Sequence, residues 1–315
     1  MPHSTEAAKS LRTPTLRVVA TNGAGAAVTA PLPSEAGSWR LEGLLGEGAL
    51  ARVFQARPVG TSANQPAAYA LKMLRPQWEQ REEAVALLRR EAKIGRTIVH
   101  PHVVPVLAAQ LREPPYFVVM PRLVGQTLAA RLETEPQLSL PTALWIARQA
   151  AEGLAAIHAH GYHHGDVKPA NIFVSPNGHV TLLDLGFARR QDEADSAVDR
   201  IVMGTINYLA PELLTSTLRA GGCSDIYSLG VVLYEMLAGR PPLVADNLAE
   251  LLDLHQERGA PNLRAARPDA PVVLSHFLRS MLAKDPLRRP QTMLEVVNAL
   301  VALEIETLAE RSRSA

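Results

Sequence analysis

The pattern of apolar and polar positions divides the chain near Thr127 into a strand-rich part and a helix-rich part. Before that point, short apolar runs interrupted by glycine and proline are typical of β-strands. The stretch 39–59 predicts a hairpin, and the runs at 67–74, 103–107 and 116–120 predict three more strands. We therefore expect a small β layer in the first part of the fold.

One amphipathic helix is expected to accompany this β layer. Apolar side chains recur at helical spacing after Pro76, on a face formed by Val85, Leu88 and Ala92. Glu91 lies about one turn beyond Leu88 and borders that face, so its carboxylate is placed to reach inward.

After Thr127 the apolar positions follow a helical period. Pro141 opens a helix and Gly161 ends it, and its buried face is expected to consist of Leu144, Ala147, Ala151 and Leu154. Two short strand-like stretches follow at 171–174 and 180–185, and then an irregular segment at 187–209. The second part of the fold is therefore expected to be mostly helical.

Further helices are expected in the last third of the chain. One begins near Ser224 or Asp225 and ends at Gly239, and amphipathic segments complete the chain at 247–257, 271–283 and 291–304. A β-rich part followed by a helical part predicts two lobes with a cleft between them.

The amino-terminal residues 1–36 differ from the rest. They are rich in Ala, Thr, Pro, Ser and Gly and show no sustained period, which predicts a flexible extension. The run LRVVA at 16–20 is its single candidate strand.

Composition narrows the class of protein. The 315 residues are 47% hydrophobic and 20% charged, with a formal net charge of +1, so nothing favours nucleic acid or an anionic membrane as partner. The longest apolar run considered, VVLYEML at 231–237, is too short for a membrane span. Cys223 is the only cysteine, which excludes an internal disulfide and favours a reducing compartment. We therefore expect a cytosolic protein.

The densest chemistry lies in HHGDVKPANIFV, residues 163–174. Asp166 can accept a proton from a hydroxyl nucleophile, and Lys168 can balance charge on a transferring phosphoryl group. Asn171 and Asp184 offer hard oxygen ligands at neighbouring strand ends, which suit Mg²⁺. A surface turn could also hold such residues, but this set in this spacing favours a phosphoryl-transfer site.

Two earlier features fit the same chemistry less specifically. Paired glycines in GEGALARV, residues 46–53, would let backbone amides approach a phosphate, although a plain hairpin turn explains them as well. Lys72 lies in an apolar strand, where a lysine usually points to solvent. It could instead reach a phosphate if Glu91 held its ammonium group in place.

Taken in order, these motifs resemble those of the protein kinases, of the eukaryotic-like serine/threonine type found in bacteria. The resemblance runs from about Trp39 to about Leu303. It rests on an ordered series of motifs, which are GEGALARV, YALK, HGDVKPAN, DLG at 184–186, GTINYLAPE at 204–212, SDIYSLGVVLYEMLAGRPPL and DPLRRP. It implies an α+β, bilobal kinase fold with an N-lobe at 37–120, a hinge at 121–124, a C-lobe at 125–304 and a tail at 305–315.

The resemblance also implies a nucleotide site. It would bind ATP with Mg²⁺, or with Mn²⁺, and Met120 would be the gatekeeper, with Pro121 and Leu123 in the hinge. The implied nucleotide-binding residues are Leu45, Gly46, Glu47, Gly48, Val53, Ala70, Lys72, Met120, Pro121 and Leu123. The implied catalytic residues are Asp166, Lys168, Lys72, Glu91 and Thr205, and the implied metal ligands are Asn171 and Asp184.

Several supporting roles follow from the same resemblance. Asp225 would brace the catalytic loop, and Glu212 would form a buried tie with Arg289 rather than a surface salt bridge. Lys168 and Thr205 would favour serine or threonine of protein substrates as acceptor. The sequence leaves the oligomeric state open.

Three positions depart from the usual family pattern: Ala51, Gly165 and Leu185. Gly165 stands where an arginine commonly holds a phosphate on the activation segment, so we expect activity that does not require that phosphate. Drift at this position, with Arg189 or Arg190 as substitute cation, is the alternative. The departures would also suit a pseudokinase scaffold, but they remove no catalytic group. A small-molecule kinase is a third possibility, against which the APE and DPLRRP motifs argue.

Overall fold

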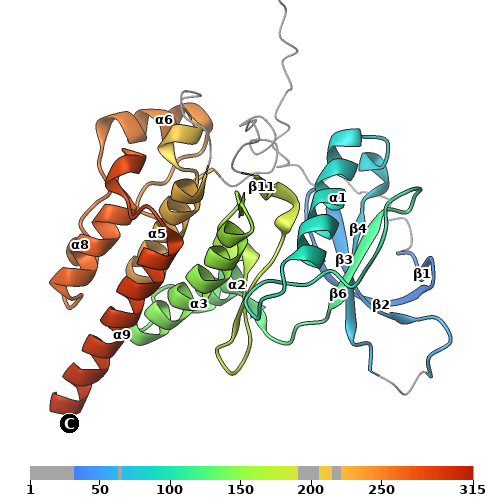
Figure 1. Cartoon of the computed structure of the whole chain (residues 1–315), viewed down its shortest axis with the longest axis horizontal. Coiled ribbons are helices and arrows are strands. Elements are labelled where there is room, and N and C mark those ends of the chain that lie inside the picture. The colour runs from blue at the N-terminus through green and yellow to red at the C-terminus, as the bar shows by residue number, and fades with distance from the viewer. Residues whose placement is uncertain (1–31, 63–65, 191–205, 215–220, 315) are drawn as a thin grey trace, which may run out of the picture. The chain divides into compact units, whose positions relative to one another are not determined.

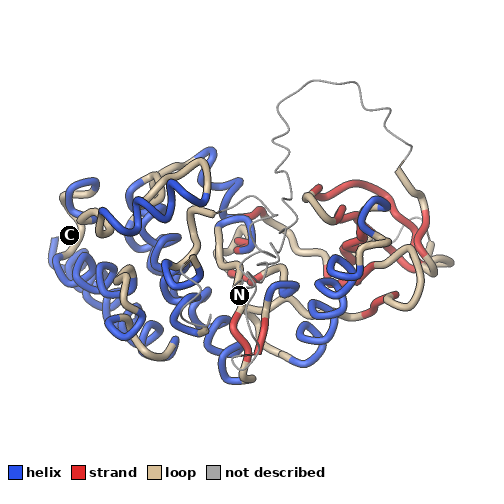
Figure 2. Tube along the Cα trace, turned by 90° about the horizontal axis from the view of Figure 1, so that it is seen from above, coloured by secondary structure: helices blue, strands red, loops and turns tan. Residues whose placement is uncertain are grey.

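The structure is a computed structural model that describes residues 32–62, 66–190, 206–214 and 221–314. The chain divides into two units after residue 32, and every element below belongs to the second unit, 33–315. Within that unit the larger sheet and the main helices are segregated, as Figures 1 and 2 show. This α+β arrangement confirms the expected fold class. None of the helices in the described ranges has the length and apolar character needed to cross a bilayer.

An antiparallel six-stranded sheet forms the first part of the second unit, in the order β1-β2-β3-β4-β6-β5. Residues along its central strands alternate between two buried clusters, which is the period of two expected of a sheet covered on both faces. The strands are β1 (Glu35–Ala36), β2 (Trp39–Glu47), β3 (Ala51–Pro58), β4 (Tyr69–Leu74), β5 (Ala108–Gln110) and β6 (Phe117–Pro121).

Helix α1 (Glu82–Thr97) joins one of these clusters. Its apolar side chains Val85, Leu88 and Ala92 are buried, as the sequence predicts, and Glu91 on the same side is also buried. A fully buried leucine contributes about 1.5–3 kcal/mol relative to exposure, so this face holds the helix against the sheet. The carboxylate of Glu91 is fixed with it.

The strand predicted at 103–107 is wrong, and the strand begins only at Ala108. Pro105 has no N–H group to give to a ladder. The neighbouring amides bond to three separate elements: Val104 donates to Leu182, Val106 to Gly95 and Leu107 to Val119. The segment therefore connects the sheet, α1 and the helical part instead of extending the sheet.

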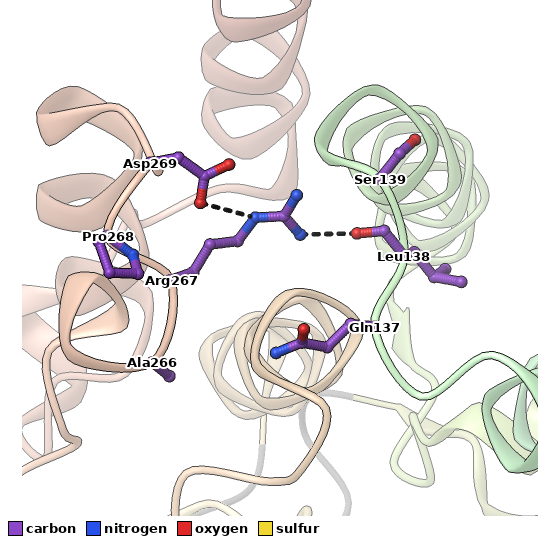
Figure 3. A pocket seen from close by; sticks show the side chains of 7 residues that line it. All are labelled: Gln137, Leu138, Ser139, Ala266, Arg267, Pro268 and Asp269. Carbon is purple, nitrogen blue, oxygen red and sulfur yellow. Dashed lines mark hydrogen bonds and ion pairs between the residues drawn. The ribbon is translucent and has the colours of Figure 1, made fainter.

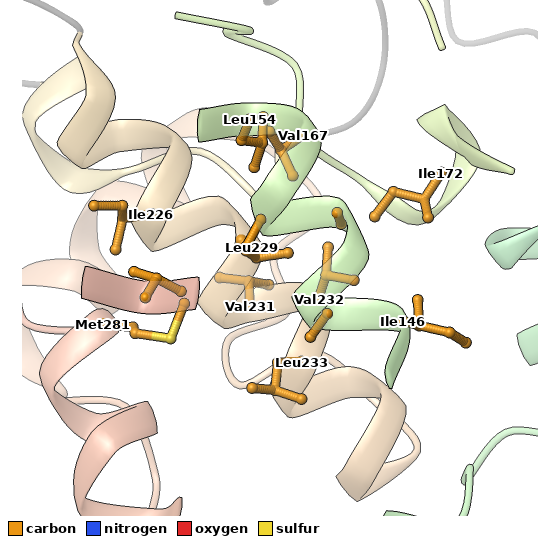
Figure 4. Close-up of a cluster of buried hydrophobic side chains, with 14 of the residues drawn as sticks. Ile146, Leu154, Val167, Ile172, Ile226, Leu229, Val231, Val232, Leu233 and Met281 are labelled. Atoms are coloured by element: carbon orange, nitrogen blue, oxygen red, sulfur yellow. The ribbon is translucent and has the colours of Figure 1, made fainter. Parts of the chain in front are cut away.

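The helical part is built around α3 and α5, which pack on each other. Figure 4 shows the apolar cluster that they share, in which side chains of both helices lie with Val167, Ile172 and Met281 from neighbouring segments. Its helices are α2 (Leu128–Thr134), α3 (Leu140–Ala159), α5 (Gly222–Ala238), α6 (Leu248–Glu257), α7 (Leu263–Ala266), α8 (Val272–Met281) and α9 (Met293–Ser314).

The boundaries of these helices follow recognisable signals. Ser139 caps α3 by accepting a hydrogen bond from the amide of Thr142, and Pro141 lies in the first turn. Gly239 ends α5 with φ +80°, a left-handed conformation that favours glycine. Both ends agree with the sequence prediction.

Three boundaries differ from prediction. Helix α5 begins at Gly222, before the predicted Ser224, and α9 continues to Ser314 instead of ending near residue 304. Strand β1 pairs with β2 inside the stretch expected to be a flexible extension. The run at 16–20 lies outside the described residues.

Two small sheets lie close to the functional residues. Strands β10 (Val180–Leu182), β9 (Ile172–Val174) and β7 (Gln126–Thr127) form one of them, which places Asn171 and Asp184 just beyond paired strand ends. Strands β8 (Tyr162–His163) and β11 (Arg189–Arg190) form the other.

Candidate active site

A cavity of about 590 Å³ is lined by the turn between β2 and β3, by β4 and α1, and by loops of the helical part. This volume is in the range of small-molecule sites, which is about 300–1,000 Å³. Every residue predicted to bind nucleotide lines it, namely Leu45, Gly46, Glu47, Gly48, Val53, Ala70, Lys72, Met120, Pro121 and Leu123. So do Glu91, Asp166, Lys168, Asn171 and Asp184.

The glycine-bearing stretch is a hairpin turn that also lines the cavity. Strand β2 ends at Glu47, β3 begins at Ala51, and the amide of Gly48 donates to the carbonyl of Ala51 at 2.9 Å. A Cβ built on Gly46 would meet no atom within 4 Å. The two explanations considered for this motif are therefore compatible: the turn is a hairpin, and its backbone borders the space that a ligand would occupy.

Lys72 points into the cavity region instead of to open solvent. Its Nζ lies 2.8 Å from Oε2 of Glu91 and 2.9 Å from Oδ1 of Asp184, and its side chain is 16% exposed. Burial alone would lower the pKa of Lys72, but the two carboxylates outweigh it and raise the pKa above 10.5. Lys72 therefore carries a permanent positive charge on the cavity wall.

Glu91 is the most buried member of this group. Its side chain is 2% exposed, and Lys72 provides the hydrogen bond that holds it. Burial raises the pKa of Glu91, since the charged form loses solvation, and Asp184 adds to the rise while Lys72 opposes it. The pair thus fixes the lysine, and the raised pKa of Glu91 reflects the cost of burying its charge.

Asp184 adopts a left-handed backbone conformation, with φ +57°. Such a conformation costs on the order of 1–3 kcal/mol and tends to persist at functional sites. The Oδ1 atom accepts hydrogen bonds from Lys72 and from the amide of Gly186. Burial would raise the pKa of Asp184, but Lys72 above all, with Lys168 and His164, lowers it. Leu185 is fully buried, so the unusual residue there keeps an apolar contact.

The loop around Asp166 holds its polar side chains close together. Nδ2 of Asn171 donates to the main-chain oxygen of Asp166 at 2.8 Å and to its Oδ2 at 2.8 Å. Nζ of Lys168 lies 2.8 Å from the same Oδ2. Because Asn171 uses its nitrogen here, its amide oxygen is the atom left for a cation. That oxygen and the Asp184 carboxylate are hard donors that fit Mg²⁺.

The backbone conformation at position 165 accounts for the glycine there. Its φ is +77°, and its amide donates to Oδ1 of Asp225 at 2.9 Å, while the amide of His164 donates to Oδ2 at 2.7 Å. His158 also contacts Oδ2, at 2.8 Å. Burial would raise the pKa of Asp225, but His158 above all, with the charges of His163 and His164, lowers it. Asp225 braces the loop as predicted, in a geometry that glycine adopts without strain.

The predicted tie between Glu212 and Arg289 forms in the helical part. Two guanidinium nitrogens of Arg289 lie 2.7 Å from the two carboxylate oxygens, and both side chains are buried. Burial would raise the pKa of Glu212, but the hydrogen bonds from Arg289 lower it. This buried geometry excludes the alternative of a surface salt bridge.

Some features of the site were not foreseen, and some predictions lie outside the described residues. Phe173 and Gly125 line the cavity without having been predicted. The sequence signal for Gly125 is a glycine directly after the predicted hinge. The structure gives the reason for it, since a Cβ at this position would lie 2.3 Å from the carbonyl oxygen of Val174. Thr205 and Ser196 fall outside the described residues.

A second hollow, of about 410 Å³, lies at the start of α3 and beyond the end of α7 (Figure 3). Arg267 crosses it, donating to the carbonyl of Leu138 at 2.6 Å and lying 3.5 Å from Asp269. None of the residues predicted to act in chemistry lines it, so the larger cavity is the candidate site.

Comparisons with known proteins agree with this geometry. Residues 39–300 match the family described as protein kinase domain. The chain is 34% identical over 260 residues to serine/threonine-protein kinase PknD of Mycobacterium tuberculosis, covering 81% of this chain and 38% of the relative. It is 33% identical over 278 residues to PknA of Corynebacterium glutamicum, covering 85% and 56%.

A further relative is serine/threonine-protein kinase PrkC of Bacillus subtilis, which is 28% identical over 256 residues, covering 81% of this chain and 39% of the relative. The chain thus spans about two fifths to just over half of the length of these three relatives. Because the family match extends over almost all of the two-lobed unit that carries the cavity, the chain belongs to the protein kinase family, in the eukaryotic-like serine/threonine group found in bacteria.

Proposed function

We propose that this chain transfers the γ-phosphoryl group of ATP to serine or threonine hydroxyls of protein substrates, including its own. Mg²⁺, or Mn²⁺ in its place, would be the metal. The observation that carries the proposal is the convergence of Lys72, Glu91, Asp166, Asn171 and Asp184 on one cavity. Two lysines and several oxygen donors around a single hollow suit a polyphosphate with its cation.

The residues divide the chemistry among themselves. Asp166 would accept the proton of the substrate hydroxyl while the hydroxyl oxygen bonds to the γ-phosphorus and the bond from that phosphorus to ADP breaks. Lys168 and Asn171 hold the Asp166 carboxylate in position before substrate arrives. Lys72, fixed by Glu91, would place the α- and β-phosphates. Asn171 and Asp184 would hold the metal, which supplies positive charge beside the phosphates when bound.

Support for a protein acceptor comes from the sequence and from the relatives. All three relatives described above are named as serine/threonine-protein kinases. Glu212 and Arg289 connect the APE and DPLRRP motifs through a buried pair, and these motifs build the platform on which a peptide would dock. The departures at Ala51, Gly165 and Leu185 leave every catalytic group in place, which favours an enzyme over a scaffold.

Asp166→Asn tests the catalytic assignment. Removing a general base costs about 10²–10⁴-fold in turnover, whereas nucleotide binding should remain, because Asp166 is not assigned to hold the phosphates. Incorporation of labelled phosphate and the nucleotide Kd measure the two effects. Asp269→Asn is the matched control, since Asp269 is 72% exposed and lines the second hollow. An Asp166→Asn protein with near wild-type turnover would overturn the assignment.

We also propose that activity does not require a phosphate on the activation segment. Gly165 has no side chain to bind one, and its left-handed φ of +77° favours glycine over arginine. Phosphatase-treated protein and Ser196→Ala protein should both keep most of the wild-type initial rate. Loss of activity after either treatment would contradict the proposal and would favour a substitute cation such as Arg189.

A further inference from the structure

Arg90, the residue before Glu91 in α1, contacts the metal-binding motif directly. Its Nη1 donates to the carbonyl oxygen of Gly186 at 3.1 Å, although the two residues are 96 positions apart in sequence. No part of the proposed mechanism uses this arginine. The contact therefore needs its own explanation.

The turn at Leu185–Phe187 lies against α1. A Cβ built on Gly186 would come within 3.4 Å of the carbonyl oxygen of Leu87, so the turn approaches the helix closely. Asp184 enters this turn in its left-handed conformation and binds Lys72. The direction of its carboxylate thus depends on how firmly the turn is held against the helix.

Lys72 and Arg90 contact this turn at two points, one just before it and one within it. Lys72 binds the Asp184 side chain, and Arg90 binds the Gly186 backbone two residues later. Because Glu91 binds Lys72 from the same helix, α1 contributes to both attachments through consecutive residues. A shift of α1 would release the lysine and the turn together.

We propose that Arg90 is a positioning residue that keeps α1 and the Asp184 turn in the arrangement needed for phosphoryl transfer. This inference rests on the proposed function and extends it to regulation of the same site. Gly165 has no guanidinium group that could order the neighbouring loop. Arg90 supplies a guanidinium group from α1 instead, and it binds a backbone carbonyl. A backbone acceptor is present whatever the phosphorylation state.

An arginine suits this role better than other side chains. Its guanidinium is charged at every accessible pH and has five N–H donors in a rigid plane, so one can serve the carbonyl while others make further contacts. Lysine keeps the positive charge and an N–H donor at a similar distance from the backbone, whereas methionine keeps only the length of the side chain. Arg90→Lys and Arg90→Met therefore separate the donor from the packing.

The kinetic experiment compares these two variants with Arg89→Met. Arg89 is the neighbouring arginine on the exposed side of α1, where it binds Glu82 and the carbonyl of Leu111. Misplacing a reacting group by about 1 Å can cost about 10²-fold, so Arg90→Met should lower kcat by about 10- to 100-fold. The KM for ATP should change by less than about 3-fold, since the phosphate-binding residues remain. Arg90→Lys should recover kcat to within about 5-fold of wild type.

Hydrogen exchange provides a readout that needs no substrate. Amides at 184–188 should exchange faster in Arg90→Met than in wild type and Arg89→Met, with an unchanged melting temperature. This measurement reports on the contact between Arg90 and Gly186 even if the wild-type protein has no kinase activity. Inactive wild-type protein would contradict the proposed function and not this inference. Unchanged kcat and exchange in Arg90→Met, or equal losses in Arg90→Lys, would overturn the inference. So would phosphatase treatment that reproduces the Arg90→Met loss, since the arginine would then act through a phosphate.

Discussion

Two buried ion pairs in this molecule look alike in composition and differ in environment. Glu212 and Arg289 meet in the helical part, and Lys72 and Glu91 meet at the cavity. Each pair contains a carboxylate with 2% exposure. Yet the pKa of Glu212 is lowered and that of Glu91 is raised.

The difference follows from how completely each carboxylate is satisfied. Arg289 is fully buried and binds both oxygens of Glu212, and Ser224 donates a further hydrogen bond at 2.7 Å. Glu91 receives its hydrogen bond from Lys72, whose charge is shared with Asp184 and which remains 16% exposed. Two hydrogen bonds from Arg289 and one from Ser224 offset the desolvation of Glu212. A single cation shared with Asp184 does not offset the desolvation of Glu91.

The two pairs also differ in how many of their hydrogen-bond donors remain available. Arg289 also donates to the carbonyl groups of Cys223, Ala283 and Lys284, so its donors are committed within the protein. The three donors of the Lys72 ammonium face two carboxylates and the cavity, so it can still bind a phosphate. We infer that the saturated pair contributes to stability and the unsaturated pair to function.

The largest effect is expected from Glu212→Gln, which removes the carboxylate of the saturated pair. The change leaves the Arg289 charge buried without its carboxylate, which typically costs about 3–5 kcal/mol in the free energy of unfolding. Urea denaturation measures the loss. Glu135→Gln is the matched control: Glu135 is 49% exposed and pairs with Arg131, so its loss should stay below about 1 kcal/mol. An exposed ion pair contributes at most about 1 kcal/mol. If Glu212→Gln lowers the free energy of unfolding by no more than that, the pair has no special structural role.

Much of this architecture was predictable because it depends on local rules. The hairpin at the glycine stretch and the ends of α3 follow from turn and cap chemistry, which act over a few residues. The Lys72–Glu91 pair was foreseen for a different reason: Glu91 borders the buried face of the next helix, where it could hold the Lys72 ammonium group, and the kinase resemblance implies the same partner.

Other features depend on partners far along the chain and were missed. The segment at 103–107 has the apolar composition of a strand, but its amides bond to the sheet, to α1 and to β10. Likewise, nothing local to Arg90 indicates that it reaches Gly186. The left-handed conformation of Asp184 was not foreseen either, because aspartate adopts positive φ more often than most non-glycine residues but still only in a minority of cases.

The smaller and more discriminating test uses pH, because the two glutamates should respond to acid in opposite directions. The pKa of Glu212 is lower in the folded state than its ordinary value of 4.5. Its contribution to stability is therefore present above 4.5 and is lost as the pH falls through the depressed value. The pKa of Glu91 is raised in the folded state. Its contribution is present below 4.5 and is lost as the pH rises through the raised value.

The free energy of unfolding of wild type, Glu91→Gln and Glu212→Gln between about pH 2 and 8, a range that covers both titrations, measures these signs. The advantage of wild type over Glu212→Gln should grow with pH, and the difference between wild type and Glu91→Gln should move the other way, by on the order of 1 kcal/mol. Parallel curves for the two variants would show that both pairs are equally satisfied. In that case the free donor capacity of Lys72, and not the balance of charge at Glu91, would have to explain how the proposed site would bind phosphate.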